Sequence, residues 1–276
     1  MKIEVLLSVL NLRENYEDFF RTINLQTDIV VGNQCNIMSD KSGCYDGHNF
    51  KIISREDRGV GKNRNVCLFN SSADVVVFAD NDIRYYDGLK EKIERNYKKY
   101  PKADLIIFNY KESRDGELLH DINKANKKAC FKDLTKFGTW AITARRLSVL
   151  KNRISFSLLF GGGAKYSCGE DSLFLFDCNK KGLKIYLTSD TLGEVIHKES
   201  TWFNGINEKY IYDKGALFCA LSPKWCKTII RYHIFKHRRK YRKYFPLSYV
   251  KKIMFAGAKD FKSRSYNESE NFNIFE

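Results

Sequence analysis

The amino-acid sequence predicts an α/β protein with a mostly parallel sheet flanked by helices. One observation is the regular alternation of short apolar runs with amphipathic segments over roughly the first 110 residues, which is typical of parallel strands joined by helical crossovers. A second is the Val-rich apolar run at 75–79, which has the character of a strand buried on both faces. A third is the length of 276 residues, which suits one large domain with an appendage or two modest domains.

The first elements follow from local hydrophobic pattern. Residues 3–10 are apolar and predict a strand, and the helix expected at 14–26 has Phe19, Phe20 and Ile23 on one face. Further strands are expected at 28–31, 50–53, 73–79 and 104–110, with a polar loop at 32–34.

Two more helices have recognisable boundaries. Gly59 and Gly61 allow a tight turn before a helix at 62–70. Pro101 ends an amphipathic helix at 87–100, because proline cannot continue a helix.

The second half is less regular. A glycine loop at 161–163 precedes Glu170 and Asp171, and the apolar stretch 173–176 predicts a helix. Another strand is expected at 184–187.

Charge and cysteine usage limit the function classes. The formal charge of +15 indicates an anionic partner, such as a nucleotide, a polyphosphate, a nucleic acid or an acidic membrane surface. The eight cysteines are scattered without a C-x-x-C pair, which argues against a zinc ribbon or a redox motif. Neither a signal segment nor a run of transmembrane length is recognisable, so we expect a cytoplasmic protein with reduced thiols.

The segment after Pro223 has its own composition. Lys and Arg are interleaved with aromatic and branched residues, and five basic residues crowd into 236–242. We expect a basic helical extension that lies on an anionic membrane surface, with its apolar residues in the acyl boundary. The apolar residues expected there are Trp225, Ile229, Ile230, Tyr232, Phe235, Tyr241, Phe245, Ile253 and Phe255.

Two carboxylates follow the most apolar strand. Asp80 and Asp82 stand at its carboxyl end, which is where open α/β sheets bind ligands. Carboxylates in such a place are costly unless a cation meets them. A divalent cation that also holds a diphosphate explains the pair, because Mg²⁺-type ions prefer carboxylate and phosphate oxygens.

Four motifs occur in a recognisable order. They are Arg58-Gly59-Val60-Gly61-Lys62-Asn63-Arg64-Asn65, Ala79-Asp80-Asn81-Asp82, Gly169-Glu170-Asp171 and Ser200-Thr201-Trp202-Phe203. Over roughly the first 220 residues the chain resembles bacterial family 2 glycosyltransferases, which have the Rossmann-like GT-A fold.

The resemblance implies a site with donor, metal and acceptor parts. Mn²⁺ or Mg²⁺ would act as a Lewis acid on the nucleoside diphosphate leaving group. Many members carry an acidic pair after the second strand that contacts uracil and ribose, whereas this chain has Gly32-Asn33-Gln34-Cys35. An amide can still hydrogen-bond a base or a ribose, and a UDP-sugar is the expected donor. The implied metal ligands are Asp80, Asp82 and His197, and the implied donor-binding residues are Asn33, Gln34, Arg58, Lys62, Arg64, Asp80 and Asn81.

On the acceptor side the resemblance implies that Glu170 and Asp171 are the catalytic residues, with Asp171 as the base. Glu170 either takes part in the chemistry or orients the acceptor or a neighbouring loop. The acceptor hydroxyl must lose its proton as it attacks, and a nearby carboxylate can take that proton. One base without an evident second nucleophile predicts inversion at the anomeric carbon. Gly162, Gly163 and Trp202 are expected to contact the acceptor.

The expected organisation is a glycosyltransferase domain at 1–222 and the basic helical extension at 223–276. Within the domain, residues 1–110 form the nucleotide-binding half and 111–222 the acceptor half. The resemblance implies transfer to a glycan or a lipid-linked acceptor in surface-polysaccharide (capsule) synthesis, at the inner face of the cytoplasmic membrane. The oligomeric state stays open.

Alternatives remain at this stage. A nucleotidyltransferase acting on sugar phosphates would also use a metal and acidic strand ends, but it usually has a glycine-rich basic loop after the first strand, where this chain has Asn11-Leu12-Arg13-Glu14. A nucleic-acid-binding protein would explain the charge but not the carboxylates, so nucleic acid is the less favoured partner. Individual residues also have structural interpretations: Asp171 could only begin a helix, and His197 could be a structural histidine.

Overall fold

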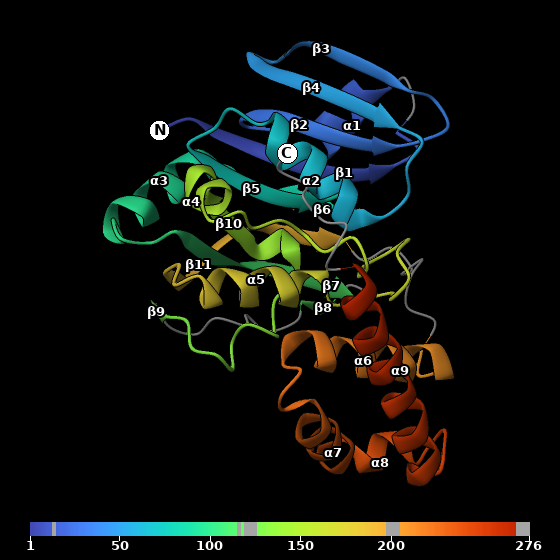
Figure 1. Cartoon of the computed structure of the whole chain (residues 1–276). Helices are drawn as coiled ribbons and strands as arrows, with labels where there is room; N and C mark the ends of the chain where they lie inside the picture. The colour runs from blue at the N-terminus through green and yellow to red at the C-terminus, as the bar shows by residue number, and fades with distance from the viewer. Residues whose placement is uncertain (13–14, 115–116, 119–125, 197–204, 269–276) are drawn as a thin grey trace.

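A computed structural model describes the backbone of residues 1–12, 15–114, 117–118, 126–196 and 205–268 (Figure 1). A single sheet flanked by helices forms the larger part, and the carboxyl-terminal helices form a layer below it. The predicted α/β class, with a central, largely parallel sheet of the GT-A type and a helical carboxyl-terminal part, is confirmed.

The elements are β1 (Ile3–Leu10), α1 (Tyr16–Thr22), β2 (Asp28–Gln34), β3 (Ser39–Tyr45), β4 (His48–Arg55), α2 (Val60–Asn70), β5 (Val75–Asp80), β6 (Ile83–Tyr85), α3 (Leu89–Lys99), β7 (Leu105–Arg114), β8 (Glu117–Leu118), β9 (Lys127–Lys128), a 3₁₀ turn (Thr139–Ala141), β10 (Ile142–Arg145), α4 (Arg146–Lys151), α5 (Glu170–Lys180), β11 (Ile185–Ile196), α6 (Glu208–Leu221), α7 (Cys226–Lys236), α8 (Arg238–Tyr241) and α9 (Leu247–Glu268).

The strand order is β3-β4-β2-β1-β5-β10-β7-β11-β6. The four neighbours β4, β2, β1 and β5 are parallel. Helix α1 connects β1 to β2 and helix α2 connects β4 to β5, whereas β2 reaches β4 through the hairpin strand β3. β10 is antiparallel and lies between β5 and β7, an insertion that the sequence pattern did not predict. The core strands β1 and β5 are almost wholly buried, in keeping with their continuous apolar runs.

Two sequence predictions for this region were wrong. The polar loop expected at 32–34 is the last part of β2, because its backbone pairs with both β1 and β4. The hairpin β3–β4 was missed, although its turn is the Asp-Gly pair Asp46-Gly47. Both turn residues have positive φ, 48° and 78°, as a two-residue hairpin of the primed type requires.

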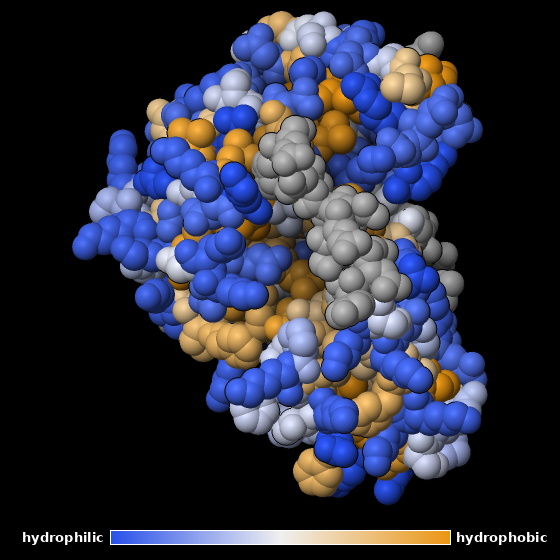
Figure 2. All heavy atoms as spheres, viewed as in Figure 1, coloured by the Kyte–Doolittle hydropathy of each residue, from blue (hydrophilic) through white to orange (hydrophobic). Residues whose placement is uncertain are grey.

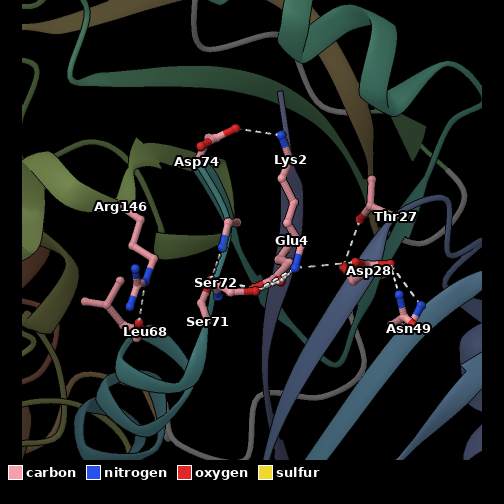
Figure 3. A network of polar contacts seen from close by, with 11 residues as sticks. Lys2, Glu4, Thr27, Asp28, Asn49, Leu68, Ser71, Ser72, Asp74 and Arg146 are labelled. Atoms are coloured by element: carbon pink, nitrogen blue, oxygen red, sulfur yellow. Dashed lines mark hydrogen bonds and ion pairs between the residues drawn. The ribbon is translucent and has the colours of Figure 1, made fainter.

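The amino-terminal edge of the sheet is closed by a polar network (Figure 3). The buried Glu4 carboxylate accepts hydrogen bonds from the Ser71 hydroxyl at 2.6 Å and the Ser72 amide at 3.0 Å, and the Lys2 ammonium lies 2.7 Å away. Burial alone would raise the pKa of Glu4, but these donors lower it below its ordinary value. The polar groups at the amino-terminal ends of these strands therefore bind one another. The carboxyl ends of the strands, on the opposite side of the sheet, are where a ligand is expected.

The carboxyl-terminal helices form a small unit with its own apolar core. α6 packs closely on α9, and each helix contributes a glycine, Gly215 or Gly257, where the other helix's backbone leaves no room for a Cβ atom. Phe261 of α9 also lies 5.6 Å from the Phe160 ring, so the unit is joined to the sheet domain. The boundary at residue 222 stays a prediction, since α6 lies before it and packs with α9. None of the described helices has both the length and the apolarity needed to cross a bilayer.

Candidate active site

The candidate site lies at the carboxyl ends of β1, β2 and β5, beside the amino termini of α2 and α5. Asp80 is the last residue of β5 and pairs with Ser8 of β1, which pairs in turn with Gly32 of β2. Asp82 follows in the turn before β6. The predicted carboxylates therefore stand at the edge where parallel α/β sheets bind ligands.

Arg64 of α2 joins the two halves of the site. Its Nη2 donates to Asp80 Oδ1 at 2.6 Å, and its Nη1 donates to Glu170 Oε1 at 2.9 Å. The Arg64 side chain is only 5% exposed, while Asp80 and Glu170 keep 29% and 14%. Burial disfavours the charge, but the two carboxylates raise the pKa of Arg64 above its ordinary value. One guanidinium thus holds the strand-end aspartate and the helix-start glutamate in a fixed relation.

The position of Arg64 depends on two buried asparagines beside it. Asn63 donates from its amide to the Ser8 hydroxyl and to the Gly32 carbonyl, each at 2.7 Å. Asn65 accepts from the Phe156 backbone amide at 2.7 Å and donates to the Phe156 carbonyl at 2.9 Å. Asn63 was not singled out from the sequence, although three consecutive polar residues inside a short helix would have been a usable signal.

The glycine loop packs against the base of this arrangement. Gly161 has φ of +105°, and a Cβ atom there would lie 2.9 Å from the Glu170 carboxyl carbon and 2.6 Å from Val60. The Gly162 carbonyl accepts from the Val60 amide at 2.9 Å. Gly161 is therefore the residue that permits close approach, whereas Gly163 is exposed. Acceptor contact by Gly162 and Gly163 stays a prediction.

Asp171 is the second residue of α5 and is partly buried. Desolvation and the neighbouring Glu170 charge raise the pKa of Asp171 to about 6, although Arg64, Lys214 and a hydrogen bond from the Ser172 amide oppose them. A carboxylate with a pKa near neutrality has the basicity that proton abstraction at physiological pH requires.

Helices α6 and α9 support the segment that leads into α5. The fully buried Asp213 of α6 accepts from the Ser167 amide at 2.9 Å and from the Ser167 hydroxyl at 2.6 Å. Asp260 of α9 accepts from the Tyr166 hydroxyl at 2.7 Å and pairs with Lys165. The helical unit therefore contributes directly to the position of the glycine loop and of Glu170.

The predicted donor-side residues lie near this edge, and several have structural duties. Asn33 is buried, and its amide bonds both backbone groups of Leu12 and the Ser54 hydroxyl. Gln34 accepts from the Gly59 amide at 2.8 Å, so it positions the turn before α2. Donor contact by Asn33 and Gln34 stays a prediction.

Arg58, Lys62 and Asn81 are exposed. Arg58 donates to Asn36 at 2.8 Å, and Lys62 lies 2.7 Å from Asp57. These contacts are near the surface and leave the side chains accessible to a ligand, but their donor role stays a prediction.

His197 and Trp202 lie outside the described residues, so their roles stay predictions. Among the residues that the structure describes, no group of three or more His, Cys, Asp or Glu side chains could hold a metal ion. The carboxylates that lie near Arg64 are Asp80, Glu170 and Asp171, and Asp82 follows Asp80 by two residues. These carboxylates outnumber the single guanidinium of Arg64, and carboxylate oxygens are hard ligands. The set therefore fits a divalent cation that takes its remaining ligands from a phosphate.

Comparisons with known proteins find one family-model match and several solved structures of similar fold. Residues 36–153 match the family model of Glycosyl transferase family 2. A crystal structure of S. aureus TarS in complex with UDP-GlcNAc has a TM-score of 0.64 and 14% identity, covering 97% of this chain and 92% of that chain. TarS in complex with UDP gives 0.60 and 15%, covering 100% and 95%. A longer TarS structure gives 0.61 and 13%, covering 92% of this chain and 55% of that chain. The comparison with curated protein sequences found no match.

Proposed function

We propose that this chain is a family 2 glycosyltransferase and that it transfers a sugar from a UDP-sugar to a hydroxyl group of a glycan or lipid-linked acceptor. The observation that carries the proposal is the Arg64 bridge between Asp80 and Glu170. Through Arg64, the Asp80 carboxylate on the proposed nucleotide-sugar side of the site and the Glu170 carboxylate on the proposed acceptor-substrate side belong to one cluster. The UDP and UDP-GlcNAc in the TarS structures support a uridine nucleotide as the carrier.

Asp80 and Asp82 are the proposed ligands of Mn²⁺ or Mg²⁺, with His197 as a further candidate. Such an ion, when bound, supplies Lewis-acid stabilisation of the diphosphate leaving group. The exposed fraction of Asp80, 29%, leaves its carboxylate within reach of an ion even while Arg64 donates to it. The hydrogen bond from Arg64 holds the Asp80 carboxylate in a fixed orientation.

Asp171 is the proposed general base. It takes the proton of the acceptor hydroxyl as that oxygen attacks the anomeric carbon, and the bond from that carbon to the diphosphate oxygen breaks, releasing UDP. A single displacement of this kind inverts the anomeric configuration. Glu170, held by Arg64, is a positioning residue for the helix start that presents Asp171.

The proposed setting is surface-polysaccharide synthesis at the cytoplasmic face of an anionic membrane. The resemblance to bacterial family 2 enzymes and the basic carboxyl-terminal segment support it. The fold and family favour glycosyl transfer over the nucleotidyltransferase and nucleic-acid-binding alternatives.

The test measures UDP release from UDP-GlcNAc and a panel of other UDP-sugars, with Mn²⁺ and with excess EDTA. We expect metal-dependent release that Asp171→Asn lowers by about 10²–10⁴-fold, because the amide cannot accept the proton. UDP affinity should change little in this variant, since Asp171 faces the acceptor. Full activity in EDTA would contradict the metal assignment, and near-normal turnover of Asp171→Asn would redirect the base assignment to Glu170.

A further inference from the structure

One segment of the helical unit contains many Lys and Arg residues but no Asp or Glu. Between Ser222 and Lys259 the chain has twelve Lys or Arg residues and no Asp or Glu. The segment covers α7, α8 and the first half of α9. The nearest acids on either side have partners outside the segment: Asp213 accepts from Ser167 and pairs with Lys209, and Asp260 accepts from Tyr166 and pairs with Lys165. The segment itself contains no acid that could compensate its cations.

Helix α7 has two different faces. Cys226, Ile230 and Ile234 recur every four residues and are buried in the core of the helical unit. The opposite face carries three large aromatic residues, whose exposed fractions are 58%, 63% and 65%. They are Trp225, Tyr232 and Phe235. Their spacing of seven and three residues places them on one side of the helix, so they form a single exposed surface.

Cations surround these aromatic rings. Lys227, Arg231 and Lys236 are exposed on α7. The Arg238 guanidinium lies 4.6 Å from the centre of the Phe235 ring, and the Lys224 ammonium lies 5.8 Å from that of Trp225. Figure 2 shows hydrophilic and hydrophobic residues interspersed over this unit. Aromatic rings with cations beside them are typical of helices that lie in a membrane interface.

The turn between α8 and α9, in the same acid-free segment, also exposes basic and aromatic side chains. Two neighbouring open hollows of about 390 and 530 Å³ are present there. Arg242, Lys243, Tyr244, Phe245, Pro246, Leu247, Ser248, Tyr249 and Lys252 line them. Hollows that combine basic and aromatic side chains can receive phosphate-bearing headgroups.

We infer that the exposed face of α7, together with the α8–α9 turn, docks on the surface of an anionic phospholipid bilayer. α7 lies in the plane of the interface, its three exposed aromatic rings enter the headgroup boundary, and the flanking cations contact the lipid phosphates. The inference names the surface through which the protein would bind the membrane, and it rests on the proposed function for the location at a membrane. We call the side of α7 that exposes Trp225, Tyr232 and Phe235, together with the cations beside these rings, the α7 face.

The structure corrects the set of residues expected from the sequence to contact lipid. Ile230 and Tyr241 are buried in the core of the helical unit, and Ile229, Ile253 and Phe255 are half-buried. Ile230 and Tyr241 are therefore unavailable to lipid, and Ile229, Ile253 and Phe255 also pack in the helical unit.

Charge argues against one other occupant of the α7 face, and the placement of the aromatic rings argues against a second. A second copy of this chain would bring two acid-free basic segments together, and like charges across an interface are repulsive. A nucleic acid would satisfy the cations but leave the aromatic rings on the helix crest without a defined partner, since these rings are not arranged along a groove.

The test is flotation of the full chain with vesicles of phosphatidylcholine alone and of phosphatidylcholine mixed with phosphatidylglycerol, at low and high salt. We expect binding to the mixed vesicles at low salt, weaker binding at high salt, and none to phosphatidylcholine alone. Replacing Lys224 and Arg238, which lie beside the exposed rings, with Gln should lower partitioning about 30-fold, because each cation near an anionic surface contributes about a fivefold gain. Absence of flotation with anionic vesicles at low salt would overturn the inference.

A second readout identifies the face that binds. Trp225 fluorescence should be quenched by lipids brominated in their acyl chains, and this vesicle-dependent quenching should disappear in Trp225→Phe. The triple variant with Ala at 225, 232 and 235 should lose at least tenfold in partitioning. Matched controls are Phe131→Ala, an aromatic residue 62% exposed outside the helical unit, and Lys98→Gln on α3. Equal losses in controls and α7 variants, or quenching that persists without Trp225, would refute the α7 face.

Failure of this inference can be told apart from failure of the proposed reaction. UDP release without vesicles should be the same in the α7 variants and the wild-type chain, because no residue of the α7 face lies in the candidate active site. A parallel gel-shift assay with single-stranded and duplex oligonucleotides tests the nucleic-acid alternative. Nucleic-acid binding that depends on the three aromatic residues, without vesicle binding, would replace the inference.

Discussion

Removal of the Arg64 guanidinium is the perturbation that the structure constrains most closely. Arg64→Met keeps the aliphatic stem but leaves Asp80 and Glu170 without their shared partner. Breaking a buried ion pair by removing one member costs about 3–5 kcal/mol. Water reaches part of both carboxylates, which reduces the cost, so we expect a loss of about 2–3 kcal/mol in the free energy of unfolding. For a chain of this size such a loss lowers Tm by about 5–10 °C.

The same variant should change the pH dependence of activity. The Arg64 charge lowers the pKa of Asp171, which stands at about 6 because desolvation and Glu170 raise it. Without that positive charge the carboxylate is harder to ionise, so the pKa of Asp171 rises further. Because the base acts when deprotonated, the acid limb of the rate profile should move to higher pH.

Urea unfolding followed by circular dichroism measures the stability change, and UDP release from UDP-GlcNAc against pH measures the second effect. Arg21→Met is the matched control, because Arg21 also pairs with an aspartate, at 3.0 Å, but is 72% exposed. Its stability should change by no more than about 0.5 kcal/mol. An Arg64→Met protein as stable as the wild type, or more stable, would show that desolvation of the guanidinium outweighs its ion pairs and would refute the reasoning.

Three further outcomes are expected. Asp82→Asn should weaken Mn²⁺-dependent UDP binding by about tenfold or more with an unchanged far-UV spectrum, and unchanged affinity in isothermal titration would remove Asp82 from the metal site. Glu4→Gln should lower stability by about 1–2 kcal/mol at neutral pH, since charged hydrogen bonds are lost. Because the pKa of Glu4 is lowered on folding, its contribution is present above its ordinary pKa of 4.5 and fades as pH falls below it, so the two urea curves should converge in acid; a gap independent of pH would contradict the role of the charge. Tyr166→Phe should cost about 1 kcal/mol through loss of the bond to Asp260, and a stability equal to wild type would show that this bond contributes nothing.

Local pattern was sufficient for many elements. The first strand lies at Ile3–Leu10 as predicted, and α3 at Leu89–Lys99 falls inside the predicted 87–100. Strands buried on both faces and amphipathic helices carry their signal in neighbouring residues, so periodicity detects them. β10 was missed because it has only four residues and takes its place through pairing with β5 and β7, which come much earlier in the chain.

The candidate site also has features that the sequence predicts and features that depend on tertiary contacts. Carboxylates at a strand end and at a helix start can be recognised from the order of motifs, and the asparagines around Arg64 could have been noticed as polar residues within a short helix. That Arg64 contacts Glu170, a residue 106 positions later, cannot be derived from either segment alone. The contact depends on how the crossover connections bring α2 and α5 to one edge of the sheet.

The sequence by itself determined the α/β class, the acidic strand end and the basic character of the carboxyl-terminal segment, because these are properties of composition and short-range order. Only the tertiary structure decided which carboxylates share a guanidinium and which aromatic residues of α7 face outward. Both outcomes are settled by burial against distant segments: α7 turns Ile230 into the helical unit and leaves Trp225 at the surface. The physical reason is that large apolar and aromatic residues occur on more than one side of α7, so its sequence period does not decide which side is buried. Packing against the neighbouring helices decides it.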